Sequence, residues 1–254
     1  MNIFDNCRAL ILAAGKGTRL ATKDDPSPKV LRRANGRPLL AYVLDSTDGM
    51  PRENITIIVG YMADMVKEAF ADSGCNFALQ GTAAYGTGYA VMCGAEAAGL
   101  ADFDGDVIIL QGDVPLVKAE TVRALLKTHR EKGSVCTLLS CRTPLKLPFG
   151  RIVRDGSGKV TAIVEDKDCT PEQKKIDELN VGLYVYKSRE MCEYLGKLKN
   201  DNKAGEYYFT DIPGMLIADG KPVEAHITPD QTELWGVNTF EDLREVERIL
   251  ASRN

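Results

Sequence analysis

Short apolar runs alternate with segments of helical hydrophobic spacing over the first 140 or so residues. The apolar runs predict strands at 9–13, 55–59, 77–79, 107–110 and 135–139. The segments between them predict helices at 39–44, 62–70, 90–98 and 121–129. Strands that alternate with helices favour a doubly wound α/β fold with a parallel sheet.

The pattern changes near residue 141. FGRIVRDGSGKVTAIVE at 149–165 predicts two short strands around an Asp-Gly-Ser-Gly turn, and NVGLYVYK at 180–187 predicts a further strand. Helical spacing returns at 189–197, 211–218 and 241–251. We therefore expect an α/β protein with a Rossmann-like, doubly wound mixed sheet. It would form a single domain, 1–254, with a nucleotide-binding half at 1–141 and a mixed half at 142–254.

Composition narrows the class of protein. With 254 residues, 44% hydrophobic and 27% charged, the chain is long and apolar enough for a large core. A formal charge of -4 without a long Lys/Arg run argues against nucleic acid as a partner. Seven scattered cysteines without a CxxC pattern favour reduced thiols. The sequence has no run of about 20 apolar residues, so we expect no membrane partner and a cytoplasmic location.

The stretch LILAAGKGTRL at 10–20 turns from a predicted strand into glycines, a threonine and cations. Such a bend lets main-chain amides surround an anion while Lys16 and Arg19 close over it, which favours a phosphate chain. Leu20 stands where the dinucleotide fingerprint needs a glycine, and the ATPase spacing is also missing. On these residues alone, an ordinary strand-to-helix turn remains an equal alternative.

Asp113 follows the apolar run of VIILQGDVPL, and a carboxylate at a strand end suits Mg²⁺. The alternative is that Asp113 caps the next helix. Lys29, in SPKVL, could neutralise a phosphate oxygen or lie on the surface like most lysines. The edge of a base could be bound by the side-chain amide of Gln80 and by open backbone groups at Gly86 and Thr87. The alternative is that these residues form an ordinary loop and helix cap.

The two histidines, His129 and His226, have no acid or nucleophile at a recognisable spacing, which argues against a hydrolase triad. Phosphate chemistry needs no such base. A sugar phosphate has a second pKa of about 6 and is largely ionised at pH 7, so the protein has to supply alignment and charge cancellation.

The segment LAAGKGTR at 12–19, with Pro28 and Lys29, resembles the signature of the sugar-nucleotide pyrophosphorylases. The chain resembles more closely the uridyltransferase domains of bacterial N-acetylglucosamine-1-phosphate uridyltransferases. This resemblance covers nearly the whole chain in order, through YGTGYAV, QGDVPL, FGRIVRD, VTAIVEDKDCTPEQKKIDELNVGLYVY, GEYYFTDIP and WGVNTFEDL.

The resemblance implies that UTP and N-acetyl-α-D-glucosamine 1-phosphate are joined into UDP-N-acetylglucosamine, with release of pyrophosphate and with Mg²⁺ as cofactor. It also implies a role for each matching position. The catalytic residues would be Arg19, Lys29 and Asp113; the nucleotide-binding residues Leu12, Ala13, Ala14, Gly15, Gln80, Gly86 and Thr87; the sugar-binding residues Gly112, Gly150, Glu165 and Asn180; and the metal ligands Asp113 and Asn238.

Three features depart from the family pattern. The segment between Arg19 and Pro28 is longer than usual, and Gln111 stands where the family often has tyrosine. The hexapeptide repeats of a left-handed β-helix are missing, so we expect no acetyl transfer and a monomer or weak oligomer. Two alternatives remain open: a sister enzyme with another sugar phosphate or base, such as a glucose-1-phosphate uridylyl- or thymidylyltransferase, and a non-catalytic nucleotide-sugar sensor.

Overall fold

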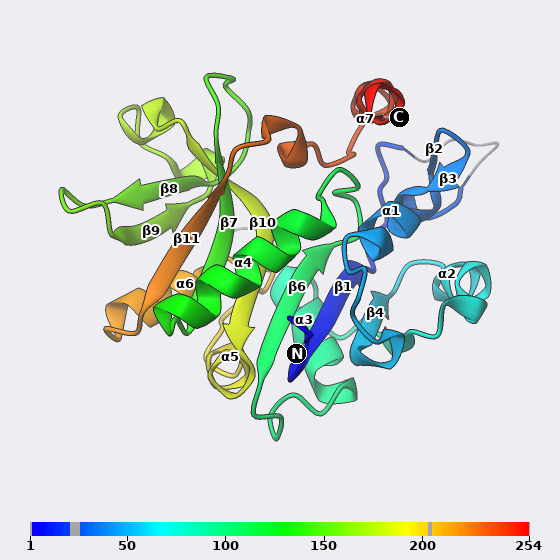
Figure 1. Cartoon of the computed structure of the whole chain (residues 1–254), viewed down its shortest axis with the longest axis horizontal. Helices are drawn as coiled ribbons and strands as arrows, with labels where there is room; N and C mark the ends of the chain where they lie inside the picture. The colour runs from blue at the N-terminus through cyan, green and yellow to red at the C-terminus, as the bar shows by residue number, and fades with distance from the viewer. Residues whose placement is uncertain (1, 21–25, 203–204, 254) are drawn as a thin grey trace.

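A nine-stranded mixed sheet runs through the protein (Figure 1). The computed structural model describes residues 2–20, 26–202 and 205–253. The main strand order is β11-β7-β10-β6-β1-β4-β5, and the hairpin of β8 and β9 joins through β10. These strands are β1 Cys7–Ala13, β4 Ile55–Val59, β5 Asn76–Leu79, β6 Asp106–Gln111, β7 Cys136–Arg142, β8 Arg151–Arg154, β9 Val160–Val164, β10 Glu178–Lys187 and β11 Val223–Thr228.

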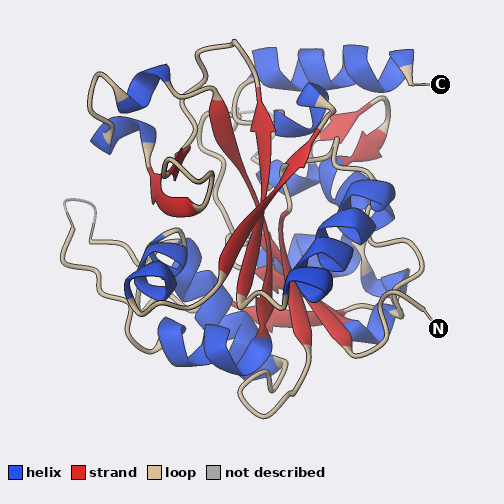
Figure 2. Ribbon diagram, turned by 60° about the vertical axis from the view of Figure 1, so that its left-hand side comes forward, coloured by secondary structure: helices blue, strands red, loops and turns tan. Residues whose placement is uncertain are grey.

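Helices flank both faces of the sheet (Figure 2). α1 Leu39–Asp45, α2 Ala63–Ala69 and α4 Ala119–Lys132 contribute to the core on one face, and α3 Thr87–Ala97, α5 Ser188–Leu195 and α6 Asp211–Ala218 to the core on the other. Along β1, Ala9 and Ile11 lie in the first core and Leu10 in the second, because successive side chains of a strand point to opposite faces. A run of apolar residues is therefore what a strand buried on both faces requires.

The predicted α/β fold is confirmed. β1, β4, β5 and β6 pair in parallel, and β10 is inserted between β6 and β7, antiparallel to both. β11 was not predicted from the sequence, and neither was the short hairpin of β2 Arg33–Ala34 and β3 Arg37–Pro38. β11 reads VEAHIT, in which polar residues interrupt the apolar pattern. It becomes a strand by pairing in parallel with β7.

The last helix, α7 Phe240–Ser252, packs with α1 and the β2–β3 hairpin around a smaller apolar cluster. Strands of both predicted halves share the large sheet. That the two halves form a single domain stays a prediction.

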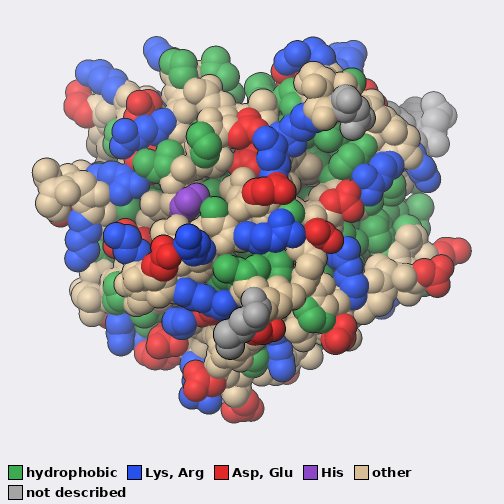
Figure 3. Space-filling view, viewed as in Figure 1, with side chains coloured by type: hydrophobic (Ala, Val, Ile, Leu, Met, Phe, Trp, Pro, Cys, Tyr) green, Lys and Arg blue, Asp and Glu red, His purple; other side chains and the backbone are tan. Residues whose placement is uncertain are grey.

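All seven cysteines are free thiols. In the described ranges, no helix is both long and apolar enough to span a bilayer. Acidic and basic side chains are interspersed over the face in Figure 3.

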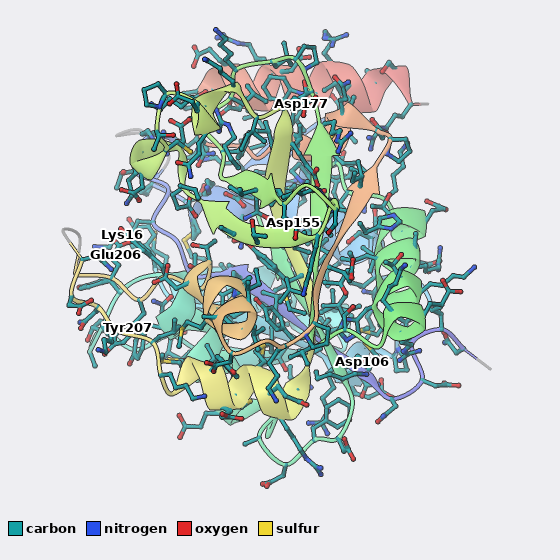
Figure 4. The ribbon with its side chains drawn as sticks, turned by 90° about the vertical axis from the view of Figure 1, so that its left-hand side faces the viewer. Lys16, Asp106, Asp155, Asp177, Glu206 and Tyr207 are labelled. Atoms are coloured by element: carbon teal, nitrogen blue, oxygen red, sulfur yellow. The ribbon has the colours of Figure 1, made fainter. Side chains whose placement is uncertain are left out.

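A buried charged group lies where β6 begins, which we call the Asp106 cluster. The Asp106 side chain is 5% exposed and contacts Arg130 Nε and Lys187 Nζ, each at 2.6 Å, and His129 Nε2 at 3.5 Å. Burial opposes ionisation, but the hydrogen bonds of these partners outweigh it and hold the pKa of Asp106 well below its usual range. Figure 4 shows Asp106 well away from Lys16 and Glu206, which line a cavity described below. The cluster therefore supports the fold at the opposite end of the strand from the candidate site.

Candidate active site

The loop after β1 packs tightly against Lys29. No heavy atom of the residues that the structure describes lies within 4 Å of the position that a β-carbon on Gly15 would take. Gly17 has a φ of 60°, and a β-carbon there would lie 2.4 Å from the Cβ of Lys29. Glycine adopts this conformation readily and leaves room for the lysine. The glycine loop therefore packs directly against the stem of Lys29.

A cavity of about 780 Å³ opens beside this loop, and we call it the nucleotide cavity. Its walls come from the loops that follow β1, β4, β5 and β6, where ligands bind in open α/β sheets. Ala13 is the exception among the predicted nucleotide-binding residues, because its side chain is buried in the core. The others line the cavity: Leu12, Ala14, Gly15, Gln80, Gly86 and Thr87.

A segment at 205–210, which we call the strap, closes one side of this cavity. The amide of Gly88 donates a hydrogen bond to the carbonyl of Tyr207 at 2.8 Å, and the hydroxyl of Thr87 accepts one from the strap at 3.2 Å. A β-carbon on Gly86 would lie 2.3 Å from that same Tyr207 oxygen. The glycines of the GTG motif thus allow the strap to contact the loop backbone directly.

Asp113, Lys29 and Asn238 meet at the end of β6. Lys29 Nζ forms an ion pair with the Asp113 carboxylate and donates to Asn238 Oδ1 at 3.1 Å. The guanidinium of Arg19 also reaches Asn238 Oδ1, at 3.4 Å. The side chains of Lys29 and Asp113 are 15% and 21% exposed. Lys29 is therefore not an ordinary surface lysine.

Asp113 does not cap α4, the alternative that the sequence left open. The N-cap residue of α4 is Lys118, whose amide donates instead to the buried carboxylate of Glu233 at 2.9 Å. The Asp113 carbonyl accepts a hydrogen bond from the amide of Val237 at 2.8 Å. This bond brings the segment before α7 alongside the end of β6.

Asn238 is held by the start of α7. Thr239 and Asp242 form a capping box, in which the Thr239 hydroxyl accepts from the Asp242 amide and the Asp242 carboxylate accepts from the Thr239 amide. The same carboxylate accepts from the amide of Asn238 at 2.8 Å. The capping box therefore fixes the backbone that presents the Asn238 side chain.

A second cavity of about 380 Å³ adjoins the first, and we call it the acceptor cavity. Gly150, Glu165 and Asn180 line it, as predicted from the resemblance. Asn180 is 7% exposed, and its Nδ2 donates to the Tyr184 hydroxyl at 2.7 Å. Gly112 does not line this cavity. It is buried where β6 ends, and a β-carbon on it would lie 2.7 Å from the Leu12 carbonyl.

Several residues that line these cavities were not predicted from the sequence. Glu206 on the strap lines both of them. Lys167 and Tyr208 line the acceptor cavity and join its two sides, with Lys167 Nζ 2.9 Å from the Tyr208 hydroxyl. This hydrogen bond raises the pKa of Lys167. Tyr61 lines the nucleotide cavity directly after β4, so the rule of strand carboxyl ends could have found it.

Asp113 and Asn238 fit a Mg²⁺ site. A carboxylate and an amide oxygen converge on one cationic group, and Mg²⁺ prefers one or two such ligands, with water and substrate phosphate completing its shell. Among the residues that the structure describes, no three His, Cys, Asp or Glu side chains gather into a metal cluster. The donor set therefore suits an ion that enters with a phosphate ligand.

Comparison with known proteins gives the family. The family model of the MobA-like NTP transferase domain matches residues 9–208. The chain is 39% identical to the bifunctional protein GlmU of Solibacter usitatus over 245 residues, which is 96% of this chain and 51% of the relative. Identity to the bifunctional protein GlmU of Halorhodospira halophila is 41% over 96% of this chain and 49% of the relative. Identity to the bifunctional protein GlmU of Streptomyces coelicolor is 40% over 100% of this chain and 52% of the relative.

The chain thus spans about half the length of the curated relatives that it matches. The resemblance noted in the sequence is confirmed at the level of the family. The longer segment before Pro28 lies largely at 21–25, outside the described residues. Because the family model matches most of its length, the chain belongs to the MobA-like NTP transferase family and is a nucleotidyltransferase related to GlmU.

Proposed function

We propose that this protein transfers the uridylyl group of UTP to N-acetyl-α-D-glucosamine 1-phosphate, forming UDP-N-acetylglucosamine and pyrophosphate. One observation carries the proposal: the nucleotide and acceptor cavities meet at shared residues, among them Thr87, Gln111 and Asp113. Transfer between two anionic substrates requires such a junction with positive charge beside it. The resemblance of the sequence motifs to N-acetylglucosamine-1-phosphate uridyltransferases supports the choice of base and sugar, and a cytoplasmic location is part of the same proposal.

The chemistry needs no general base. An oxygen of the acceptor phosphate attacks the α-phosphorus in line, a new P–O bond forms, and the bond to the β-phosphate oxygen breaks to release pyrophosphate. The attacking oxygen is already ionised at pH 7, because its second pKa is about 6. Neither His129 nor His226 lines either cavity, in agreement with this route.

The protein supplies position and charge. The backbone from Leu12 to Gly15 would hold the triphosphate, with Gln80 and Gly86 on the uracil side. Arg19 and Lys29 would stabilise the negative charge that spreads over the phosphates in the transition state. Asp113 and Asn238 would hold Mg²⁺, which supplies further charge neutralisation when bound.

The acceptor cavity holds the sugar in this proposal. Glu165 and Asn180 would bind its hydroxyl and acetamido groups, and Gly150 leaves room beside them. The Gly150 carbonyl accepts a hydrogen bond from the Asn180 amide at 2.8 Å, so the two residues are positioned together. A carboxylate binds sugar hydroxyls strongly because charge strengthens the hydrogen bond.

A substrate panel tests the proposal. Pyrophosphate release is measured with UTP, CTP, dTTP and GTP against four sugar 1-phosphates, and UTP with N-acetylglucosamine 1-phosphate should give the highest kcat/KM. A higher value for another pair would identify the sister enzyme. UTP binding without pyrophosphate release from any pair would identify the sensor. Either result refutes the proposed reaction.

Asp113→Ala tests the proposed metal ligand. We expect kcat/KM to fall by about 10³, because charge neutralisation at the transferred phosphoryl group is a large part of catalysis. Asp72→Ala is a matched control, since Asp72 is exposed in a short 3-10 helix at 71–73, away from both cavities. Circular dichroism checks that both variants fold. Retained magnesium-dependent turnover in Asp113→Ala would contradict the metal assignment.

A further inference from the structure

The position of Lys29 bears on when a divalent cation can bind. Its ammonium contacts one oxygen of each residue of the proposed metal site, Asp113 Oδ2 and Asn238 Oδ1. The Lys29 stem is held in place because Pro28 fixes the backbone before it and Val30 after it is buried. Lys29 therefore occupies the position proposed for the metal ion, and the backbone on both sides of it holds its stem there.

The ammonium and a divalent cation cannot share these oxygens. Both would lie within bonding distance of the same two atoms, and the repulsion between like charges at that separation is large at any effective dielectric of a protein. Asp113 is also largely shielded from solvent, so its attraction to Lys29 is weakly screened. A cation that enters has to displace Lys29.

The nucleotide cavity provides the place to which Lys29 can move. Lys29 lines that cavity together with Gly15 and Lys16, where the triphosphate would bind. The glycine loop contacts the Lys29 stem at Gly17, so a ligand held by the loop acts next to the lysine. An incoming triphosphate offers the ammonium new oxygen partners at the same time as it brings the metal.

From this geometry we infer that Lys29 is a resident counter-ion. In the free protein it blocks divalent cations from Asp113 and Asn238, and it transfers its ammonium to the phosphates when the metal and nucleotide arrive together. The inference rests on the proposed function, because it takes a metal-bound nucleoside triphosphate as the ligand.

Titration of the nucleotide-free protein with Mn²⁺, followed by electron paramagnetic resonance, tests the blocking role. Lys29→Met keeps the stem and removes the charge, and we expect it to bind Mn²⁺ at least about tenfold more tightly than wild type. The factor follows because the variant lacks a like charge beside these oxygens, and the repulsion between two charges at this separation corresponds to more than about a factor of ten at an effective dielectric of about 20. Adding Asp113→Asn to Lys29→Met should abolish the gain.

Lys16→Met is the matched control, since Lys16 is an exposed cation lining the same cavity, with no interaction to Asp113 or Asn238 in the described part of the chain. Its Mn²⁺ affinity should change less than twofold. Lys29→Gln, which keeps a hydrogen-bond donor, serves if Lys29→Met does not fold. A Lys29 variant that binds Mn²⁺ no more tightly than wild type, or an equal gain in Lys16→Met, would overturn the inference.

UTP binding at a Mn²⁺ concentration that saturates both proteins tests the transfer of the ammonium. Wild type should bind UTP about tenfold more tightly than Lys29→Met, because the lysine reaches the phosphates only in wild type. Equal affinities would overturn this half of the inference. These titrations contain no sugar phosphate. A wild-type protein that fails to release pyrophosphate would refute the proposed reaction while leaving the Mn²⁺ result readable.

Discussion

Gly86→Ala should displace the strap, which borders both cavities. Gly86 has φ 104° and ψ 162°, a conformation that is open essentially to glycine alone. An added β-carbon would lie 2.3 Å from the carbonyl oxygen and 2.8 Å from the amide nitrogen of Tyr207. Both atoms belong to the backbone, so the strap itself has to move.

The expected cost follows from these two effects. Forcing alanine into this backbone region costs roughly 1–3 kcal/mol. Moving the strap breaks the hydrogen bonds from the Gly88 amide to the Tyr207 carbonyl and from the Tyr207 amide to the Tyr85 carbonyl, each worth about 1 kcal/mol. We therefore expect the free energy of unfolding to fall by about 4 kcal/mol. The KM values for UTP and for the sugar phosphate should both rise, because the strap borders both cavities.

Urea denaturation followed by circular dichroism measures the free energy. Gly205→Ala is the control, because Gly205 lies on the same strap with φ 65°, and no heavy atom of the described residues lies within 4 Å of the position that a β-carbon would take. It should lose only about 1 kcal/mol, the cost of a left-handed alanine. A Gly86→Ala variant that loses no more than Gly205→Ala, with unchanged KM values, would refute the reasoning.

Three further predictions concern residues that support the fold or the candidate site. Asp106→Asn should lower the free energy of unfolding by about 3 kcal/mol at pH 7, because it leaves the basic partners of the Asp106 cluster unpaired. The folded pKa of Asp106 lies well below that of an unfolded aspartate, so this stabilisation is complete above about pH 5 and is lost progressively as pH falls from about 4 towards the folded pKa. Urea denaturation at pH 7 and pH 3 should show the difference shrinking. Thr239→Ala removes one half of the capping box, and should cost about 1 kcal/mol in unfolding and weaken Mn²⁺ binding to the UTP complex. Tyr184→Phe leaves Asn180 Nδ2 buried without its acceptor, and should cost about 1–3 kcal/mol and raise the KM of the sugar phosphate but not that of UTP.

Each of these three predictions has a result that would contradict it. A difference between wild type and Asp106→Asn that stays constant down to pH 3 would contradict the linkage to this carboxylate. Unchanged Mn²⁺ affinity in Thr239→Ala would show that Asn238 is held by other contacts. Equal rises of both KM values in Tyr184→Phe would point to a general loss of structure.

The sequence by itself determined the strands of the first half and the edge of the sheet where the site lies. β4 agrees residue for residue with the predicted range, and the predicted β1 is extended by only two residues. This succeeded because strands buried on both faces need uninterrupted apolar runs, and polar or glycine-rich segments after them end the strands locally. The residues of LILAAGKGTRL and QGDVPL were recognisable for the same reason.

Only the tertiary structure decided how distant segments meet. β10 is inserted antiparallel between β6 and β7, and β11 exists through its pairing with β7. The contacts of Lys29 with Asp113 and Asn238 join residues 84 and 209 positions apart. Ala13 and Gly112 belong to the right motifs, yet their side-chain positions are taken up by the core and by the Leu12 backbone. Local hydrophobic patterns report which face of an element is buried, whereas the partner across a cavity depends on long-range packing that no local pattern contains.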